Sequence, residues 1–208
     1  AWADAWQRAG LRYYPKLVVA IPYTPATGPR LLVRSDKDFE TYAQQLIDAA
    51  TAYTQQNGMS SLHWLFTDQR DTQQFQKDKR YLMRLGCQFH WQNDGYRDFD
   101  DYLSRFSAEK RKKLRRERRM VREQGIEIEV RHGDEMEAVH WDIYHRYYRS
   151  TFERKSGIPT LSREFFMEIG ETMPHNVVVV MAKHQGEYVA AAFNVRGTDT
   201  LYGRHWGC

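Results

Sequence analysis

A run of basic side chains is the most concentrated chemical feature of this 208-residue chain. Residues 110–122 contain nine Lys or Arg residues and a single acid, Glu117, so their local charge is +8. The net charge of the whole chain is only +4, so the remainder carries −4. A local patch of this kind favours binding of a specific anionic partner over non-specific electrostatic binding. Arginine suits a phosphate-bearing partner, because its planar guanidinium can donate to two oxygens at once.

Helical spacing would gather these cations on adjoining faces of one helix, which we expect over residues 107–124, ended by Gly125. Like charges at this spacing repel, so a purely structural helix would gain from interleaved acids. We therefore interpret the helix as an anion-binding surface. Its predicted binding residues are Lys110, Arg111, Arg115, Arg118, Arg119 and Arg122. The alternative is a solvated helix whose Leu114 and Val121, seven residues apart, touch the core.

A second candidate for anion binding is the Pro- and Gly-containing loop over residues 22–30. Thr27, Gly28 and Arg30 could offer a hydroxyl, a backbone amide and a guanidinium to an anion. The loop lacks the GxxxxGK[ST] pattern of a phosphate-binding P-loop. A plain turn is therefore the favoured interpretation.

The third candidate lies near residue 208, in a strand expected over residues 200–206. Strict alternation along a strand would place Tyr202, Arg204 and Trp206 on one face. An arginine between two aromatic rings could recognise a ligand, or it could be a stacked structural arginine. The sequence leaves these two interpretations equally open.

Other catalytic or metal-binding patterns are not found in the sequence. Cys87 and Cys208 form no zinc or disulfide spacing, and no GxSxG motif occurs. His140 and His145 are five residues apart and do not share a helix face, so we expect no metal site. Acids cluster just before the basic helix, where they could hold a general base, although ion pairs with the arginines are favoured. They are Asp94, Asp98, Asp100 and Asp101.

Hydrophobic periodicity predicts alternating strands and helices in both halves of the chain. In the first half we expect strands over 16–21, 62–66 and 87–91, and helices over 36–57 and 71–85. In the second half we expect a strand over 126–131, helices over 135–153 and 162–172, and a meander of strands over 177–182, 188–195 and 200–206. A turn at 93–95 is the expected boundary, so the predicted domains are 1–95 and 96–208.

Composition and the absence of an apolar run long enough to cross a bilayer favour a soluble, cytoplasmic protein. The first residues do not have the features of a signal peptide. We expect this chain to be an internal segment of a longer protein, since no initiator Met is present and the chain stops within an expected strand.

Taken in order, these segments resemble the FemAB-like transferases of the GNAT (N-acyltransferase) superfamily. Ser107 to Arg119 is similar to the basic opening helix of that family, and Gly125 to Val130 is similar to the strand that follows it. The stretch over 148–157 and the strands from Val177, with Gly-Glu-Tyr-Val-Ala-Ala-Ala at 186–192, also match. Residues 14–32 resemble the first domain of the branch linked to peptidoglycan biosynthesis.

The resemblance implies an α/β chain of the α+β type with a GNAT-like acyl-CoA N-acyltransferase fold, in which helices cover both faces of a mixed sheet. It implies two tandem GNAT-like domains, each only partly present: the later part of the first over 1–95 and the earlier part of the second over 96–208. The expected activity is the transfer of an acyl or aminoacyl group to an amine. Because the amine can attack the donor directly, no covalent intermediate with the enzyme is required.

The donor implied by the resemblance is either an acyl-CoA or an aminoacyl-tRNA, and the sequence does not decide between them. The GNAT pyrophosphate loop, R/Q-x-x-G-x-G/A, is not found, so we expect this segment alone to be inactive. The resemblance identifies no catalytic residue. The competing hypothesis is a non-catalytic module that binds RNA or tRNA through the basic helix at 107–124.

Overall fold

The structure is a computed structural model that describes residues 2–155 and 157–208 and divides into two compact units, 1–90 and 91–208. The division falls slightly before the boundary expected at residue 95. Helices and strands occur in both units, with a separate sheet in each. This mixture confirms the predicted α/β class, whereas the GNAT-like arrangement of the elements stays a prediction.

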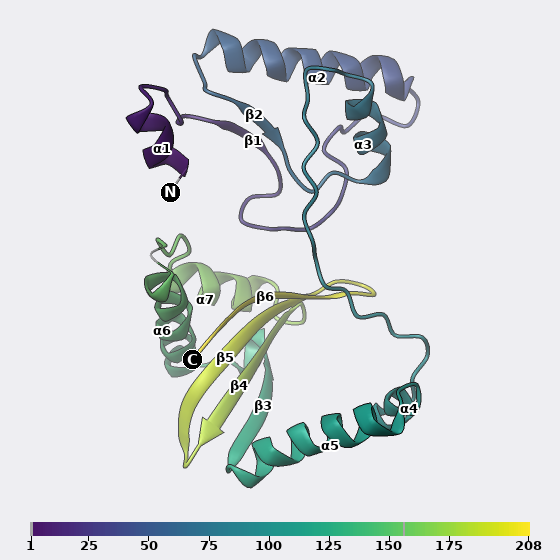
Figure 1. Cartoon of the computed structure of the whole chain (residues 1–208). Helices are drawn as coiled ribbons and strands as arrows, with labels where there is room; N and C mark the ends of the chain where they lie inside the picture. Colours follow the sequence, from purple (N-terminus) through teal and green to yellow (C-terminus); the bar gives the residue numbers. More distant parts are fainter. Residues whose placement is uncertain (1, 156) are drawn as a thin grey trace. The chain divides into compact units, whose positions relative to one another are not determined.

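The first unit is built around two short parallel strands, β1 (Leu17–Val19) and β2 (Leu62–Trp64), joined through the long helix α2 (Phe39–Gln56). Figure 1 shows this strand–helix–strand crossover together with the short helices α1 (Trp2–Arg8) and α3 (Gln69–Gln76). The crossover was predicted from the sequence, although both strands are shorter than expected.

The core of the first unit is small and depends on one buried acid. Ala43 and Ile47 of α2 pack with Leu31 and Phe75, and all four side chains are buried. Asp71, only 1% exposed, accepts hydrogen bonds from the backbone amides of Arg30 and Leu31 at 2.5 and 3.1 Å. The carboxylate thereby fastens the loop after β1 to α3.

Two predictions for this part of the chain are wrong. The helix predicted over 71–85 is shorter than expected, and the strand predicted over 87–91 does not form. Helix α3 ends at Gln76, and the chain from 82 to 92 has no regular structure. Arg80 closes the turn by donating to Asp78 from both its backbone and its guanidinium. Leu85 and Phe89 are 93% and 98% exposed, so this segment has strand-like composition but finds no partner strand among the described residues.

The second unit contains a four-stranded sheet with the order β3-β4-β5-β6, in which every neighbouring pair is antiparallel. The strands are β3 (Ile126–His132), β4 (Val177–His184), β5 (Glu187–Arg196) and β6 (Leu201–Gly207). The helices are α4 (Phe99–Ser104), α5 (Ala108–Glu123), α6 (Ala138–Arg154) and α7 (Arg163–Thr172), with a 3₁₀ turn at Gly133–Glu135. The predicted meander is confirmed.

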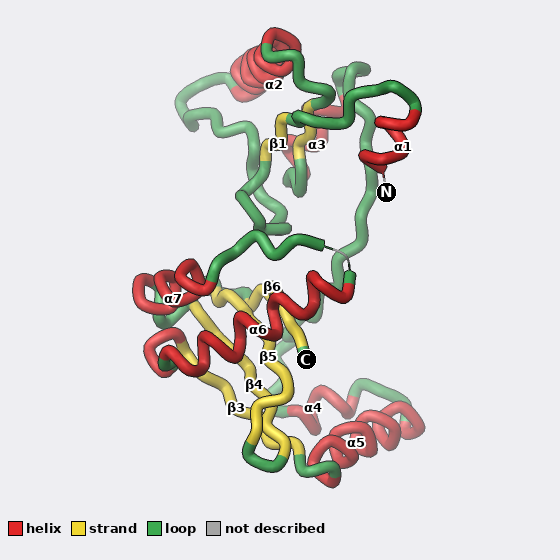
Figure 2. Tube along the Cα trace, turned by 90° about the vertical axis from the view of Figure 1, so that its left-hand side faces the viewer, coloured by secondary structure: helices red, strands yellow, loops and turns green. Residues whose placement is uncertain are grey.

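Helices α6 and α7 lie against the same face of this sheet (Figures 1 and 2). Tyr144 and Tyr148 of α6 and Phe166 of α7 are fully or almost fully buried there, against Val179 and Phe193 of the sheet. The rings of Tyr144 and Phe166 meet edge to face at 4.9 Å. Aromatic packing between helix and sheet therefore forms the core of the second unit.

Among the described strands the prediction of a mixed sheet is wrong, and the prediction of helices on both faces is wrong for the sheet of the second unit. The sheet of the first unit is purely parallel and that of the second purely antiparallel. Opposite the α6 face, Ile128, Val130 and Trp206 remain 57%, 59% and 67% exposed, so no helix of the second unit covers them. Short turns between β4, β5 and β6 force antiparallel pairing, whereas a parallel neighbour would need a longer crossover.

We predict that Asp71→Ala lowers the free energy of unfolding by about 2–4 kcal/mol, because two backbone amides lose their buried acceptor. Chemical denaturation followed by circular dichroism would measure the change. The control is Asp36→Ala, whose carboxylate pairs with Arg34 on the surface and should contribute less than about 1 kcal/mol. Equal losses in the two variants would contradict this role of Asp71.

Gly170 of α7 gives a second test, because an added Cβ would lie 2.5 Å from Cζ2 of Trp141. Alanine normally stabilises a helix by about 1 kcal/mol relative to glycine. We predict that Gly170→Ala instead destabilises the second unit by about 1–3 kcal/mol, since the added carbon overpacks the core. Gly203→Ala, with its nearest neighbour at an ordinary 3.6 Å, is the control. A stabilised Gly170→Ala variant would refute the close approach of α7 to α6.

Candidate polyanion-binding site

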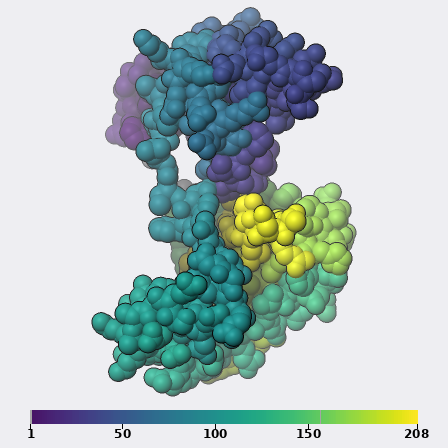
Figure 3. Space-filling model, turned by 90° about the vertical axis from the view of Figure 1, so that its right-hand side faces the viewer, coloured from purple at the N-terminus to yellow at the C-terminus, as the bar shows by residue number. Residues whose placement is uncertain are grey.

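The basic helix forms where the sequence predicted it, as α5. Ser107 caps its start by accepting a hydrogen bond from the backbone of Lys110, and Gly125, with a φ of +71°, ends it. This left-handed conformation is one that glycine adopts without strain. None of the residues of α5 is buried, and the helix forms part of the exposed teal surface in Figure 3. Capping and charge, rather than core packing, therefore define this helix.

One side of α5 borders a shallow groove of about 450 Å³. Its lining residues are Ala108, Arg111, Lys112, Arg115, Arg116 and Arg119. Five of these six side chains are cations, and their spacing of three or four residues places them along a single stripe. The groove brings together three of the predicted binding residues, Arg111, Arg115 and Arg119. Lys110, Arg118 and Arg122, which were also predicted to bind, are not part of its lining.

The preceding helix α4 contacts α5 through the side chains of two adjacent residues. Arg115 pairs with Asp100 at 3.0 Å, and the guanidinium of Arg118 lies 3.9 Å from the ring centre of Phe99. Asp101 pairs with Arg97 at 3.2 Å. The prediction that this acidic cluster pairs with the arginines of the basic helix is confirmed for Asp100, whereas Asp101 pairs with Arg97, which precedes that helix.

The cations of α5 differ in how far they are already engaged. Arg111 donates to the carbonyl of Phe106 at 2.6 Å, and Arg119 pairs with Glu123 at 3.3 Å. For Lys112 and Arg116, no ion pair or hydrogen bond of the side chain occurs within residues 2–155 and 157–208. These two side chains can bind an anion without first breaking an internal contact.

The alternative interpretation, a solvated helix whose Leu114 and Val121 touch the core, is confirmed in part: α5 is solvated and buries none of its residues, but neither Leu114 nor Val121 belongs to the core. Leu114 is only half-buried, and Val121 is 42% exposed. The reason is that α5 joins the sheet through its C-terminal turn and rests on α4, so no apolar stripe is needed.

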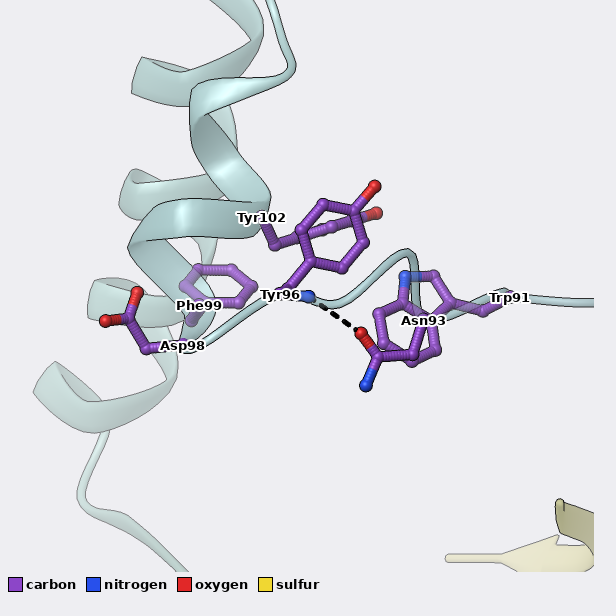
Figure 4. Close-up of a pocket in the computed structure, with 6 residues that line it drawn as sticks. All are labelled: Trp91, Asn93, Tyr96, Asp98, Phe99 and Tyr102. Carbon is purple, nitrogen blue, oxygen red and sulfur yellow. Dashed lines mark hydrogen bonds between the residues drawn. The ribbon is translucent and has the colours of Figure 1, made fainter. Parts of the chain in front are cut away.

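A second hollow, of about 430 Å³, lies beside α4 and was not predicted from the sequence. Figure 4 shows the aromatic rings and polar groups around it. Its lining residues are Trp91, Asn93, Tyr96, Asp98, Phe99 and Tyr102. The sequence carried a signal, since four aromatic residues occur within 91–102, but that run was interpreted only as a turn and a lead into the basic helix.

The candidate loop in the first unit forms as a turn, and its arginine is used internally. Arg30 donates to the carbonyls of Leu65, Ala26 and Pro29 through its Nε, Nη2 and Nη1 atoms, at 2.9, 2.6 and 3.2 Å. Gly28 bridges to Thr67, whose hydroxyl lies 2.8 Å from that of Thr72. The side chain of Arg30 thus braces the loop, and nothing in this geometry favours the binding of an anion there by Thr27 or Gly28.

In β6, the expected alternation of Tyr202, Arg204 and Trp206 is broken by an irregularity. Asn194 pairs with Gly203 but Phe193 pairs with His205, so Arg204 is an extra residue in β6. Tyr202 and Trp206 therefore face opposite sides of the sheet, and the prediction of a shared face is wrong. Arg204 is half-buried instead, and burial lowers its pKa while nearby Tyr148 and Tyr144 oppose that shift.

The polar groups next to Arg204 are almost enclosed. Burial and the charge of Arg204 lower the pKa of His205 to about 4, so its ring is neutral at pH 7. The ring of His205 meets that of Tyr148 edge to face at 4.9 Å. Burial also raises the pKa of Tyr144 far above its usual value. The hydroxyl of Tyr144 and Nδ1 of His205 have no hydrogen-bond partner among the described residues. Because Arg204 makes no ion pair or ring-stacking contact among the described residues, its ligand-binding and structural interpretations both stay predictions.

A charged cluster on β3, β4 and β5 was not found by sequence reasoning. Glu129 accepts hydrogen bonds from Lys183, from the Tyr188 hydroxyl at 2.8 Å and from Arg131 at 3.2 Å. The bonds from Lys183 and Tyr188 lower the pKa of Glu129 to about 2. Arg131 is two residues away on the same strand, but Lys183 and Tyr188 are more than fifty positions away, so no local motif predicts the cluster. A carboxylate with so low a pKa joins strands well but is a poor general base near neutral pH.

Within residues 2–155 and 157–208, no three His, Cys, Asp or Glu side chains are grouped as a metal site would require. No described helix has the length and apolar character to span a bilayer.

Fold and groove together define an α/β protein with a cationic surface on α5. The chain belongs to the FemAB-like family, described as peptidoglycan biosynthesis and recognition, whose model matches residues 1–208. The predicted family is thereby confirmed, and it indicates a peptidoglycan-related role. Comparison with curated proteins gives no significant match.

The low pKa of Glu129 predicts a pH-dependent contribution to stability. Its folded pKa of about 2 lies below the ordinary value of 4.5, so the stabilisation is complete above about pH 4.5 and is lost as the pH falls towards 2. Glu129→Gln should therefore be less stable than the parent protein at pH 7, and the difference should shrink below pH 4.5. Unfolding measured between pH 2.5 and 7, with exposed Glu187→Gln as control, checks this. A difference independent of pH would contradict the ion-pair role.

Proposed function

We propose that this protein transfers an acyl or aminoacyl group to an amine acceptor in peptidoglycan-related chemistry. The observation that carries the proposal is the family match over residues 1–208. The cationic groove on α5 supports it, because an acyl-CoA and an aminoacyl-tRNA both present phosphates.

The chemistry requires few groups from the protein. An amine attacks the thioester or ester carbonyl of the donor directly, and a positioned N–H stabilises the developing oxyanion. A carboxylate or a water molecule accepts the proton released by the amine. The carbon–sulfur or carbon–oxygen bond of the donor then breaks, and the coenzyme A thiol or the ribose hydroxyl of the tRNA leaves after taking up a proton. The role we assign to α5 is to hold the phosphates of the donor, so that its acyl group is oriented for attack.

The second candidate function is RNA binding without catalysis. The five cations around one groove favour it, because phosphate contacts supply most of the affinity of non-specific nucleic-acid binding. This candidate predicts salt-sensitive RNA binding with no turnover. Transfer activity is what distinguishes the two functions.

The test uses the double variant Lys112→Ala/Arg116→Ala, which removes two groove cations without breaking an internal contact of either side chain. Each lost charge-assisted hydrogen bond is worth about 1.5–3 kcal/mol, so we expect the KM for the donor to rise at least about tenfold with little change in kcat. Transfer of a labelled group from acyl-CoA or aminoacyl-tRNA to an amine-bearing peptidoglycan precursor is measured.

The control is Lys113→Ala, on the same helix but outside the groove, where Lys113 lies 3.9 Å from Glu117. Its kinetics should match those of the parent protein. Because residues 1–208 alone are expected to be inactive, the assay uses the full-length protein, and absence of its transfer from both donors would overturn the proposed activity. If salt-sensitive RNA binding persisted without transfer, the second candidate would be the function.

A further inference from the structure

The hollow beside α4 is walled by aromatic rings that contact one another. The ring centres of Tyr96 and Tyr102 are 5.2 Å apart, those of Trp91 and Tyr102 are 5.9 Å apart, and those of Phe99 and Tyr102 are 6.0 Å apart. Trp91 is 62% exposed and Phe99 is 37% exposed, so part of each ring remains accessible to solvent. With about 430 Å³, the hollow falls in the size range of small-molecule sites.

Cations flank these rings. The guanidinium of Arg118 lies 3.9 Å from the centre of the Phe99 ring, and that of Arg105 lies 5.5 Å from the centre of the Tyr96 ring. Next to the hollow, Lys110 lies 5.5 Å from the centre of Phe106. A purely apolar partner would have to bury these charges, whereas a flat ring that carries an anion would be attracted by both features.

The aromatic hollow and the cationic groove are joined through α4. Phe99 lines the hollow and contacts Arg118 of α5, while the next residue, Asp100, pairs with the groove residue Arg115 at 3.0 Å. Neighbouring residues of one short helix thus contact both sites. A ligand with a ring in the hollow can place its phosphates towards α5.

The rim of the hollow offers directional polar groups. The Oδ1 atom of Asn93 accepts from the backbone amide of Gly95 at 3.1 Å and from that of Tyr96 at 2.9 Å, and the second bond is drawn in Figure 4. These bonds fix the orientation of the amide and leave its nitrogen as a donor. Asp98 caps α4 through Oδ1, which leaves Oδ2 as an acceptor. One donor and one acceptor at the rim match the edge of a nucleobase.

We infer that the hollow at residues 91–102 binds the nucleobase of a nucleoside phosphate, whose phosphates lie along the groove of α5. This inference rests on the proposed function, since it assigns the ring to the phosphate-bearing donor. The chemistry is shared by coenzyme A and by the end of an RNA chain. Stacking on Trp91 and Tyr96 supplies the recognition of the base, and α5 supplies the attraction for its charge.

The test separates the base from the phosphates. Affinity is measured for a fluorescent oligoadenylate RNA and for an abasic oligonucleotide with the same number of phosphates. Trp91→Ala should weaken the binding of oligoadenylate roughly tenfold, because loss of one stacked base is expected to cost between about 5-fold and 100-fold. It should leave the abasic ligand unaffected. Lys112→Ala/Arg116→Ala should weaken both ligands.

Two controls keep the result interpretable. Trp91→Phe should keep most of the affinity, because it retains an aromatic face. Trp2→Ala removes an exposed tryptophan of the first unit that lies outside the hollow, and should change nothing. The inference is overturned if Trp91→Ala leaves the binding of both base-bearing ligands, oligoadenylate and coenzyme A, unchanged, or if it weakens the abasic ligand equally.

The source of the nucleotide is found by repeating the titration with coenzyme A. If Trp91→Ala weakens coenzyme A alone, the base belongs to a coenzyme; if it weakens oligoadenylate alone, the base belongs to RNA. Either result supports the nucleobase site. If the proposed transferase activity is wrong but the nucleobase site is right, no transfer is observed, while Trp91→Ala still weakens only the base-bearing ligand.

Discussion

Repulsion among the cations of α5 is the constraint around which this part of the second unit is organised. A helix that buries none of its residues cannot offset that repulsion with apolar packing. It is stabilised instead by its caps and by α4, which supplies a carboxylate from Asp100 to Arg115 and an aromatic face from Phe99 to Arg118. The contacts with α4 that stabilise α5 also place the aromatic residues of α4 beside it. The packing of α4 against α5 therefore both stabilises the basic helix and forms the candidate binding site.

Local patterns in the sequence predicted most of the second unit. Gly125 predicted the end of α5, and the short turns after β4 and β5 predicted the meander. These features depend on residues a few positions apart, which is the range over which caps and turns act. The groove was foreseen in part, because helical spacing predicts which cations adjoin. Helical spacing did not predict that the guanidinium of Arg118 would lie against the ring of Phe99.

Contacts between distant residues account for what the sequence did not reveal. The buried role of Asp71 depends on a loop some forty positions earlier, and the cluster at Glu129 joins three strands. The segment around Phe89 has the composition of a strand, yet strand formation requires a partner, which composition does not supply. One extra residue at Arg204 was enough to reverse the face of every residue after it.

Strand β3 has a consequence for how copies of the protein behave in solution. It lies at one end of the described sheet, where unpaired backbone groups offer a template to another chain. Its charged residues Glu129 and Arg131 point towards the α6 side, where they are fixed by partners, and Ile128 and Val130 point away. A foreign strand added here would bring its own side chains against these fixed charges. Inward-facing charge of this kind discourages edge-to-edge aggregation, so the ion-pair cluster protects the colloidal stability of the protein as well as its sheet.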